Sequence, residues 1–372
     1  MVPLLAPMLQ AKPADQCAYD IVALGEIMLR LDPGDRRIRT TRRFDVWDSG
    51  AEYNVARAFR KVFGLRGAML TAFARNEVGL LLEDIILASG LDLSYVHWVP
   101  YDGVGRNVRN GLNFSERGFG VRGALGCVDR AYTAISQLRP QDIDLAEIFV
   151  TKGSRWFHTG GIMAGLSDQA AETTLAVMKA ARDAGTIVSY DLNYRPSLWA
   201  GAGGIERCRE VNRELAKYVD VMIGNEEDFT VCLGQAVDGF DDNLTALDVA
   251  AYRRMIQTAA EVYPNFQVIA TTLRQARTAT RNDWSAIAWS RSRGFAEAKS
   301  RPDLEIYDRL GSGDSFASGL AYGLLIHDDL QLAVEYGAAN GALAQTSPGD
   351  TTTASLAEIE RLADGNSARV QR

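Results

Sequence analysis

The sequence has few of the residues on which disulfide scaffolds and histidine-rich metal centres depend. Its 372 residues include four cysteines, scattered without a CxxC pair, and only three histidines, which lie far apart. This usage excludes a disulfide framework and a zinc ribbon, and it favours reduced thiols in a cytoplasmic protein. Any metal ion that the protein uses should therefore be held by carboxylates.

Long apolar runs and an excess of basic charge are also missing. No stretch of 18 apolar residues occurs, so we expect no membrane span. The 40 Lys and Arg against 47 Asp and Glu give a formal net charge of −7, which is unsuited to general nucleic-acid binding. The N-terminal apolar stretch has no Lys or Arg before it, unlike a signal peptide, and we expect residues 1–18 to form a flexible tail.

Strand-like and helix-like periodicity alternate through most of the chain. Apolar residues make up 47% and charged residues 23%, which is ordinary for a globular protein. The alternation predicts an α/β fold with a mostly parallel central sheet covered on both faces. The expected strands are 21–24, 68–74, 186–190, 219–223 and 267–271, and the expected helices are 54–63, 77–89, 169–183, 226–233, 313–326 and 330–345.

Two segments break this alternation. Residues 30–48 and 102–131 are polar, rich in Arg and Gly, and without helical periodicity. Segments of this kind, inserted into an α/β core, usually form a lid or an edge sheet beside the ligand. We therefore expect a single domain over residues 1–372 with a small β lid.

The most informative segment is Asp308-Arg-Leu-Gly-Ser-Gly-Asp-Ser-Phe316, which leads directly into an apolar helix. Its small residues let backbone N–H groups converge at a helix N-terminus, where they favour an anion. Asp314 would repel a bound phosphate, but it suits a base that deprotonates a hydroxyl attacking a phosphoryl group. The alternative is a tight turn followed by an ordinary helix start.

Other nucleotide-binding motifs are missing from the sequence. The dipeptide Gly-Lys never occurs, so there is no P-loop, and there is no His-Arg-Asp catalytic loop. The residues after the first expected strand do not supply the GxGxxG of a dinucleotide fold.

Several motifs in the same order resemble the ribokinase-like (PfkB) carbohydrate kinases, and most closely their 2-keto-3-deoxygluconate kinase branch. The family signature D-T-x-G-A-G-D is similar to the segment that starts at Asp308, and G-G-A-E-x-N-V-A is similar to a loop in which Ser49 replaces the first glycine. The resemblance covers roughly residues 20–360. Its motifs are Gly25-Glu-Ile-Met28, Ser49-Gly-Ala-Glu-Tyr-Asn-Val-Ala56, Asp191-Leu-Asn-Tyr-Arg-Pro-Ser-Leu-Trp199, Gly224-Asn-Glu-Glu-Asp228 and Asp308 to Asp314.

The resemblance implies a three-layer ribokinase-like fold and a set of site residues. Asp314 would be the catalytic base, and the amides of Gly311, Ser312 and Gly313 would stabilise the transferred phosphoryl group. Substrate-binding residues would be Gly50, Ala51, Asn54, Arg130, Arg195 and Asp350. ATP-binding residues would be Asn225, Thr272, Arg274, Gly311, Gly313 and Asn340. Glu227 and Asp228 would hold Mg²⁺, although acidic residues in a first helical turn also stabilise the helix dipole.

The charge of a sugar acid accounts for two of these residues. In an acidic protein, the carboxylate of a keto acid needs fixed cations, and guanidinium groups suit that task better than lysines. Arg130 and Arg195 are the candidates, but a solvent-exposed lid charge is the alternative for Arg130. The resemblance places tyrosines where this chain has Asn113 and Asp129, which leaves the sugar open.

We therefore expect an ATP- and Mg²⁺-dependent kinase that phosphorylates a hydroxymethyl group of 2-keto-3-deoxygluconate or a related sugar acid. The alternatives are a neutral-sugar kinase, such as a fructokinase or ribokinase, and a non-catalytic sugar sensor. The sensor should have lost the base or the glycines, and this chain has both. The resemblance also implies a homodimer that pairs through the lid, and it allows activation by a monovalent cation.

Overall fold

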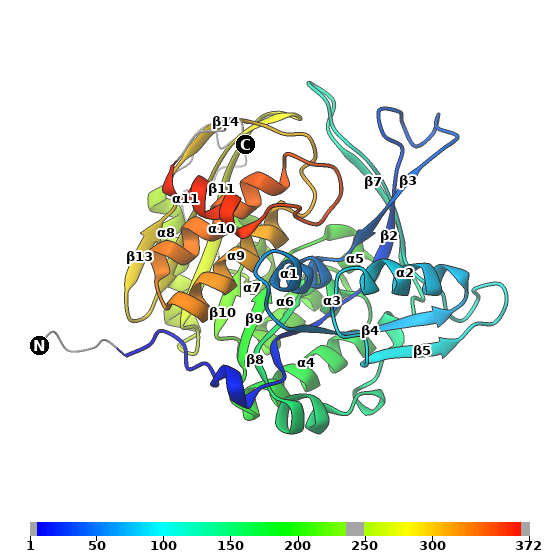
Figure 1. Cartoon of the computed structure of the whole chain (residues 1–372), viewed down its shortest axis with the longest axis horizontal. Coiled ribbons are helices and arrows are strands. Elements are labelled where there is room, and N and C mark those ends of the chain that lie inside the picture. Colours follow the sequence, from blue (N-terminus) through cyan, green and yellow to red (C-terminus); the bar gives the residue numbers. More distant parts are fainter. Residues whose placement is uncertain (1–5, 236–248, 366–372) are drawn as a thin grey trace, which may run out of the picture.

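A large, mostly parallel β-sheet runs through the middle of the structure, a computed structural model that describes residues 6–235 and 249–365 (Figure 1). Its strand order is β13-β12-β11-β10-β9-β8-β1-β4-β5, and β14 pairs with β12. The strands from β11 to β5 are parallel, whereas β12 to β14 form an antiparallel edge. The strands of this sheet are β1 (Tyr19–Leu24), β4 (Gly67–Arg75), β5 (Val96–Pro100), β8 (Ser154–Gly160), β9 (Ile187–Asp191), β10 (Val221–Ile223), β11 (Val268–Thr278), β12 (Arg281–Ser290), β13 (Gly294–Glu297) and β14 (Arg301–Glu305).

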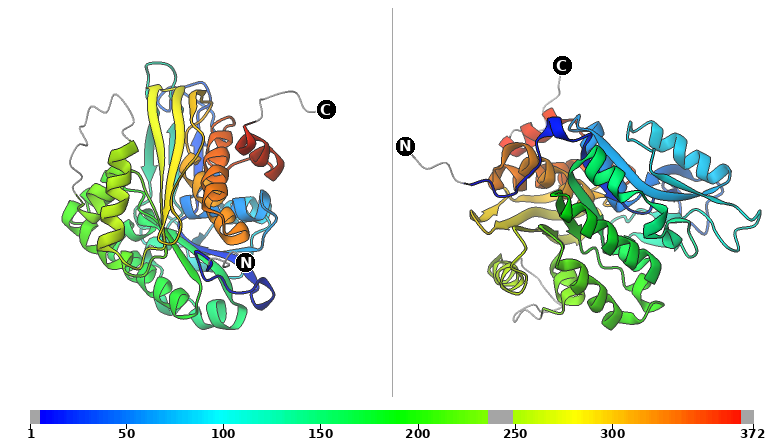
Figure 2. Two further views of the ribbon diagram at one scale, coloured as in Figure 1. Left: turned by 90° about the vertical axis from the view of Figure 1, so that its left-hand side faces the viewer. Right: turned by 90° about the horizontal axis from the view of Figure 1, so that it is seen from below.

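Helices cover both faces of this sheet, as the edge-on views show (Figure 2). A strand that is covered on both faces carries mostly apolar residues, and all six residues of β1 are buried. Asp20, the one charged residue of β1, is paired with Arg66 and Arg155. The helices are α1 (Ala51–Lys61), α2 (Glu77–Leu87), α3 (Gly161–Gly165), α4 (Asp168–Asp183), α5 (Pro196–Ala200), α6 (Gly204–Ala216), α7 (Glu226–Leu233), α8 (Val249–Val262), α9 (Ser312–His327), α10 (Leu330–Ala344) and α11 (Leu356–Asp364). The shorter helical turns are η1 (Ala14–Gln16), η2 (Ile135–Gln137), η3 (Pro140–Asp142) and η4 (Glu147–Lys152).

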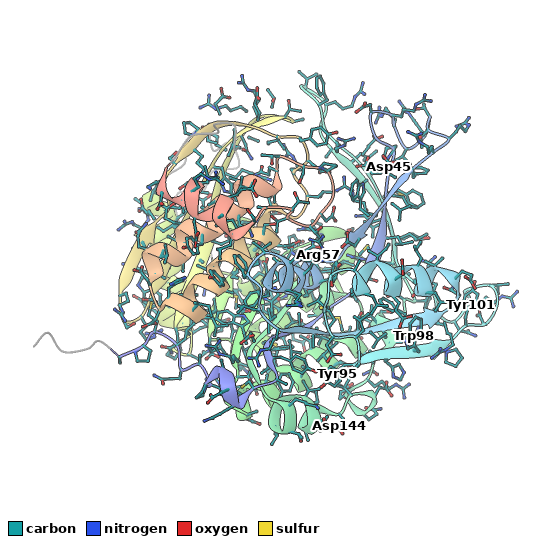
Figure 3. The ribbon with its side chains drawn as sticks, in the orientation of Figure 1. Asp45, Arg57, Tyr95, Trp98, Tyr101 and Asp144 are labelled. Carbon is teal, nitrogen blue, oxygen red and sulfur yellow. The ribbon has the colours of Figure 1, made fainter. Side chains whose placement is uncertain are left out.

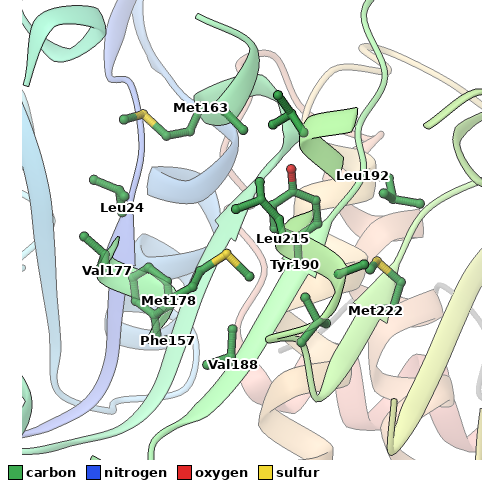
Figure 4. Close-up of a cluster of buried hydrophobic side chains, with 14 of the residues drawn as sticks. Leu24, Phe157, Met163, Val177, Met178, Val188, Tyr190, Leu192, Leu215 and Met222 are labelled. Carbon is green, nitrogen blue, oxygen red and sulfur yellow. The ribbon is translucent and has the colours of Figure 1, made fainter. Parts of the chain in front are cut away.

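The core is divided by the sheet. On one face α4, α6, α7 and α8 pack in a cluster that includes Val177 and Met222 (Figure 4). On the other face α1, α9, α10 and α11 pack in a second cluster around Trp156 and Phe316. Val22 belongs to the first cluster and Ile21 to the second, as expected from the alternation of side chains along a strand. The prediction of a parallel sheet covered on both faces is confirmed.

A separate four-stranded sheet forms the small β lid. Its order is β3-β2-β6-β7, from β2 (Met28–Asp32), β3 (Asp45–Ser49), β6 (Leu112–Glu116) and β7 (Leu125–Asp129). The hairpin β2–β3 lies between β1 and α1 in the sequence, and β6–β7 follows β5. Figure 3 labels Asp45 on the lid and Arg57 on α1 below it. The polar segments expected to form a lid supply these strands, so the predicted small sheet is confirmed.

The N-terminal segment corrects one expectation. Residues 1–5 lie outside the described residues, but within the rest of the expected tail Met8, Leu9 and Cys17 are buried. Met8 and Leu9 are buried among the residues of the second cluster, and the backbone N–H of Met8 donates a 2.8 Å hydrogen bond to Asp328. Apolar side chains in this short segment therefore anchor it.

Several elements were not predicted from the sequence. They include β8 in the centre of the sheet, the antiparallel edge from β12 to β14, and the amphipathic helices α6 and α8. Within residues 6–235 and 249–365, no helix has the length and apolar character needed to cross a membrane.

Candidate active site

The candidate site is a cavity of about 470 Å³ at the carboxyl ends of the parallel strands, beneath the lid. Strand order reverses between β1 and β8, and such a switch point is where open α/β sheets bind ligands. Most residues that the sequence singled out line this cavity: Gly50, Ala51, Asn54, Arg130, Arg195, Asn225, Asp228, Thr272, Arg274, Gly311, Ser312, Gly313, Asp314 and Asp350.

The glycine-containing loop forms the predicted turn into helix α9. The helix begins at Ser312, and Gly311 before it has φ +71°, a left-handed conformation that glycine adopts without strain. Asp308 stabilises the turn by accepting a 3.2 Å hydrogen bond from the N–H of Leu310. The first N–H groups of a helix have no partner within it, so this loop directs donors into the cavity.

Asp314 lies in the first turn of α9 beside these donors. Its Oδ2 accepts a 2.6 Å hydrogen bond from Nδ2 of Asn54 on helix α1. Burial raises the pKa of Asp314 to about 6, and the negative charge of Asp350 adds to the rise, whereas the Asn54 hydrogen bond and the Arg195 charge oppose it. A carboxylate with this pKa is ionised at neutral pH and is basic enough to take a proton.

Helix α7 has the bounds that the sequence predicted, and its capping explains Asp228. Oδ2 of Asp228 accepts a hydrogen bond from the N–H of Asn225, and Oδ1 accepts one from the N–H of Tyr194, both at 2.8 Å. The Asn225 side chain in turn accepts from the N–H of Asp228 at 2.9 Å. Asp228 therefore closes a capping box and also lines the cavity.

Of the two glutamates beside Asp228, the one that lines the cavity is Glu226 and not Glu227, which was expected to hold Mg²⁺. Glu226 lines the cavity and accepts a 3.0 Å hydrogen bond from the hydroxyl of Tyr252, whereas the exposed Glu227 is not among the cavity-lining residues. Glu227 follows one position later on the helix and so points elsewhere. Among the described residues, no group of three or more His, Cys, Asp or Glu side chains is placed to hold a metal ion. Mg²⁺ commonly binds through one or two carboxylates together with substrate phosphates, and Glu226 with Asp228 fits that pattern.

The two arginines predicted to hold a carboxylate differ in their surroundings. Nε of Arg130 lies 2.8 Å from Oε2 of Glu26, which is 2% exposed, so this guanidinium already has a buried partner. Arg195 is exposed, and its one recorded hydrogen bond goes to the carbonyl of Tyr194 at 2.9 Å. No ion pair of Arg195 occurs within the described parts of the chain. Of these two arginines, Arg195 is therefore the one that is available to a ligand.

Two predicted residues have structural roles of their own. Both oxygens of Asp350 are occupied, Oδ1 by Arg30 and Oδ2 by the Ser49 hydroxyl, each at 2.5 Å. Gly50 packs on the backbone so closely that a Cβ there would lie 2.2 Å from the carbonyl oxygen of Glu26. Its lack of a side chain is therefore required by the protein itself.

Asn340, expected in the ATP site, lies outside the candidate cavity. Asn340 is fully buried between α9 and α10, where Nδ2 donates to the carbonyl of Ser315 at 2.9 Å and Oδ1 accepts from Thr352 at 2.9 Å. It is not among the residues that line the cavity. Its amide is fully used in joining these segments.

Other residues of the cavity were not singled out from the sequence as site residues. They include Asp191, the last residue of β9, Asn193 just after that strand, and Arg309 beside the glycine loop. The first two stand where a parallel strand ends, which is a signal that sequence reasoning can use. Burial raises the pKa of Asp191 well above its ordinary value, with the negative charge of Asp228 as the next cause.

Behind the cavity lies a buried carboxyl group, that of Glu52 on α1. It is 1% exposed, and burial raises its pKa to about 8, with the negative charge of Asp314 contributing. Glu52 is therefore predominantly neutral at pH 7. Its carboxyl occupies the space over Gly25, where a Cβ would lie 2.2 Å from Oε2.

Comparisons with known proteins show the family and the fold of the chain. A sequence profile described as pfkB family carbohydrate kinase matches residues 133–357. The crystal structure of a 2-dehydro-3-deoxygluconokinase from Thermotoga maritima is 36% identical, covers 93% of this chain and 99% of that chain, and has a TM-score of 0.83. A 2-dehydro-3-deoxygalactonokinase from Haloferax volcanii is 28% identical over 95% of this chain and 99% of the relative. A fructokinase from Xylella fastidiosa, 20% identical over 93% of this chain and 99% of that chain, shares the fold with a TM-score of 0.68.

Proposed function

The chain belongs to the pfkB family of carbohydrate kinases, and on this premise we propose that it phosphorylates a hydroxymethyl group of 2-keto-3-deoxygluconate, also named 2-dehydro-3-deoxygluconate, or of a closely related sugar acid, with ATP as donor. Relatives named for the gluconate and galactonate forms support a sugar acid, and both epimers are candidates. The fructokinase of the same fold was solved with bound ATP, which supports the choice of donor.

The observation that carries this proposal is the position of Asp314. Its carboxylate lies in the first turn of α9, next to the glycine loop, which is residues 308–313. It is bonded to Asn54 of α1, the helix that follows Ser49 and Gly50, which form the sugar loop. In the proposed reaction, Asp314 takes the proton of the hydroxymethyl group. The oxygen then bonds to the γ-phosphorus of ATP as the bond between that phosphorus and the β–γ bridging oxygen breaks, and ADP leaves.

Charge on the transferred phosphoryl group would be stabilised by the chain's own donors. Gly311, Ser312 and Gly313 line the cavity, and their amides would be these donors. One donor in such a site commonly contributes on the order of 3 kcal/mol. Arg274 and Thr272 follow the end of the parallel part of β11 and would face the nucleotide phosphates. Mg²⁺ would neutralise phosphate charge when bound, and Glu226 and Asp228, with Asn225 beside them, would hold it.

The carboxylate of the substrate would bind mainly to Arg195. This guanidinium is exposed at the cavity, and its positive charge opposes the rise in the pKa of the buried Asp314 and Asp228. Arg130 would form the pocket wall while paired with Glu26. A neutral sugar would leave Arg195 without an anionic partner, which favours the sugar acid.

Two finer expectations stay predictions. A homodimer through the lid is supported by exposed apolar side chains on its strands, namely Val46 on β3 and Leu125 and Val128 on β7. Light scattering of the wild type and of Leu125→Asp would test it. Activation by a monovalent cation would be tested by assays with and without potassium chloride.

The proposed activity is tested by ATP-dependent phosphorylation of a panel of sugars. The panel contains 2-keto-3-deoxygluconate, its galacto epimer, 5-dehydro-2-deoxygluconate, fructose and ribose. Asp314→Asn is run beside the wild type, with Asp168→Asn as the matched control because Asp168 is an exposed aspartate in the first turn of α4. We expect turnover of sugar acids that is lost in Asp314→Asn and retained in the control.

Other outcomes separate the alternatives. Turnover of fructose or ribose alone would keep the base and overturn the sugar-acid substrate. A folded wild type that turns over none of these sugars would overturn the proposed substrate class. Ligand-dependent shifts in Tm without turnover would instead favour a sugar sensor.

A further inference from the structure

Arg30 is a fully buried arginine that does not line the cavity. It lies on the lid strand β2, and its side chain is 0% exposed. A guanidinium is almost never buried in this way unless carboxylates surround it, because loss of hydration costs several kcal/mol. The position of its partners therefore shows what the residue holds together.

The partners of Arg30 are three aspartates from three different segments. Nη1 donates to Oδ1 of Asp350 at 2.5 Å, in the loop after α10. Nη2 donates to Oδ2 of Asp308 at 2.6 Å, in the loop before α9, and to Oδ2 of Asp32 on its own strand at 3.2 Å. One guanidinium thus connects the lid to the loop before the candidate catalytic helix α9 and to the loop after α10.

The second oxygens of Asp350 and Asp308 bond to residues of the site. Oδ2 of Asp350 accepts a 2.5 Å hydrogen bond from the hydroxyl of Ser49, the residue that begins the sugar loop. Oδ1 of Asp308 accepts the 3.2 Å hydrogen bond from the N–H of Leu310 that shapes the glycine loop. Arg30 is therefore connected to Ser49 of the sugar loop through the carboxylate of Asp350. It is connected to Leu310 of the glycine loop through the carboxylate of Asp308.

The backbone of Asp350 completes the connection. Its carbonyl oxygen packs directly on Gly311, where a Cβ would lie 1.6 Å from it. Movement of Asp350 would consequently displace the turn that places the amides of the glycine loop. Arg30 is the only basic side chain within ion-pair distance of Asp350 in the described parts of the chain.

From these contacts we propose that Arg30 is a positioning residue for phosphoryl transfer. It holds the sugar loop and the glycine loop in fixed relation through Asp350 and Asp308, without touching either substrate. This proposal rests on the proposed kinase function. It differs from a purely structural role, in which Arg30 would neutralise buried aspartates and affect only the amount of folded protein.

The test compares Arg30→Ala and Arg30→Lys with Arg66→Met. Arg66 is a matched control because it also neutralises a buried carboxylate, that of Asp20, at the opposite end of β1 from the site. We expect kcat of Arg30→Ala to fall by about 100-fold, the loss that a misplacement of about 1 Å can cause, with little change in KM for ATP. Arg66→Met should lower Tm without lowering kcat per folded molecule.

Chemical rescue separates positioning from stability. Guanidinium ion fits the space that Arg30→Ala leaves between Asp308 and Asp350 and can donate to both carboxylates. Added at concentrations that leave the wild type folded, it should restore part of the kcat of Arg30→Ala and leave Arg66→Met unchanged. If Arg30→Ala does not fold, Arg30→Lys and, as a separate variant, Ser49→Ala, which removes only the hydroxyl that donates to Asp350, should still show reduced kcat.

Two results would overturn the proposal. One is a folded Arg30→Lys or Arg30→Ala with wild-type kcat, and the other is a loss of kcat that guanidinium does not restore and that Arg66→Met shares. A second measurement does not depend on the sugar. The rise in Tm caused by ADP with aluminium fluoride, which imitates the transferring phosphoryl group, should be smaller in Arg30→Ala than in the wild type. If the wild type shows no turnover, the proposed function is refuted. The difference in the Tm rise between Arg30→Ala and the wild type still decides the role of Arg30.

Discussion

Asn54 and Asp314 are 260 residues apart in the sequence and are joined by a 2.6 Å hydrogen bond from Nδ2 to Oδ2. The bond links the helix that starts at the sugar loop with the helix that starts at the glycine loop. It also acts on the proposed base, because a donor to the ionised carboxylate favours the charged form.

The first prediction concerns the pH dependence of catalysis. Because the pKa of Asp314 is about 6, kcat/KM should fall about tenfold per unit as the pH drops below about 6. Asn54→Ala removes the hydrogen bond that lowers this pKa, so the decline should begin at a higher pH. The measurement is a pH profile of kcat/KM for both proteins.

Asp228 is the control for this assignment, because burial raises its pKa to about 6 as well. Asp228→Asn should leave the pH at which activity declines unchanged, even if the rate is lower. A decline that disappears in Asp228→Asn would assign the pH dependence to that residue instead.

The second prediction concerns stability and the buried Glu52. Burial raises its folded-state pKa from 4.5 to about 8, so the folded protein binds a proton that the unfolded chain loses near pH 4.5. This contribution is fully present below about pH 4.5 and is lost as the pH rises through about 8, by about 1.4 kcal/mol per pH unit. Glu52→Gln should therefore unfold in urea with a smaller loss of stability between pH 6 and 8.5 than the wild type. Equal losses in the two proteins would show that Glu52 is ionised in both states.

The third prediction compares two glycines of the same loop. Gly311 has φ +71° and packs on Asp350, whereas a Cβ at Gly313 would meet no atom within 4 Å. Gly311→Ala should therefore destabilise the fold by about 2–4 kcal/mol, from left-handed strain and overpacking together. Gly313→Ala should have a Tm close to that of the wild type. Thermal unfolding measures both, and similar Tm values for the two variants would argue against the close packing of Gly311.

The fourth prediction separates Arg195 from Arg130. Arg195→Met removes a cation that has no ion-pair partner in the described residues, so Tm should stay unchanged while KM for the sugar acid rises about 10- to 100-fold, the value of a charged hydrogen bond. Arg130→Met leaves the buried Glu26 unpaired and should lower Tm instead. Steady-state kinetics and thermal unfolding together distinguish the two. An unchanged KM in Arg195→Met would remove the argument for a sugar acid.

Sequence patterns correctly predicted features that depend on neighbouring residues, such as where a helix begins. The acidic first turn and the Asn225 cap set the start of α7, and the observed helix has the expected bounds. The glycines before Asp314 predicted the turn into α9 for the same reason. Motif order then placed these segments in one cavity, because parallel strands bring their carboxyl ends to the same edge of the sheet.

Side-chain contacts between segments far apart in the sequence could not be predicted from sequence patterns. Nothing near Asn340 in the sequence indicates that Ser315 and Thr352 occupy its amide. The pairing of Arg30 with Asp350 spans 320 residues, and a lid arginine gives no sign of it. The exchange of Glu226 for Glu227 depends on which side of one helical turn faces the cavity, a rotation that a run of acidic residues leaves undefined.

The lid sheet has a consequence for how the molecule assembles. Strand β2 leaves the core directly after β1, yet Leu29 pairs with Leu112, 83 residues further along the chain. The entropy of closing so long a loop is offset only after β1, β4 and β5 have brought the two segments close together. The sugar-facing wall of the cavity is therefore a late-forming part of the fold, and its amides should exchange with solvent before those of the parallel sheet beneath.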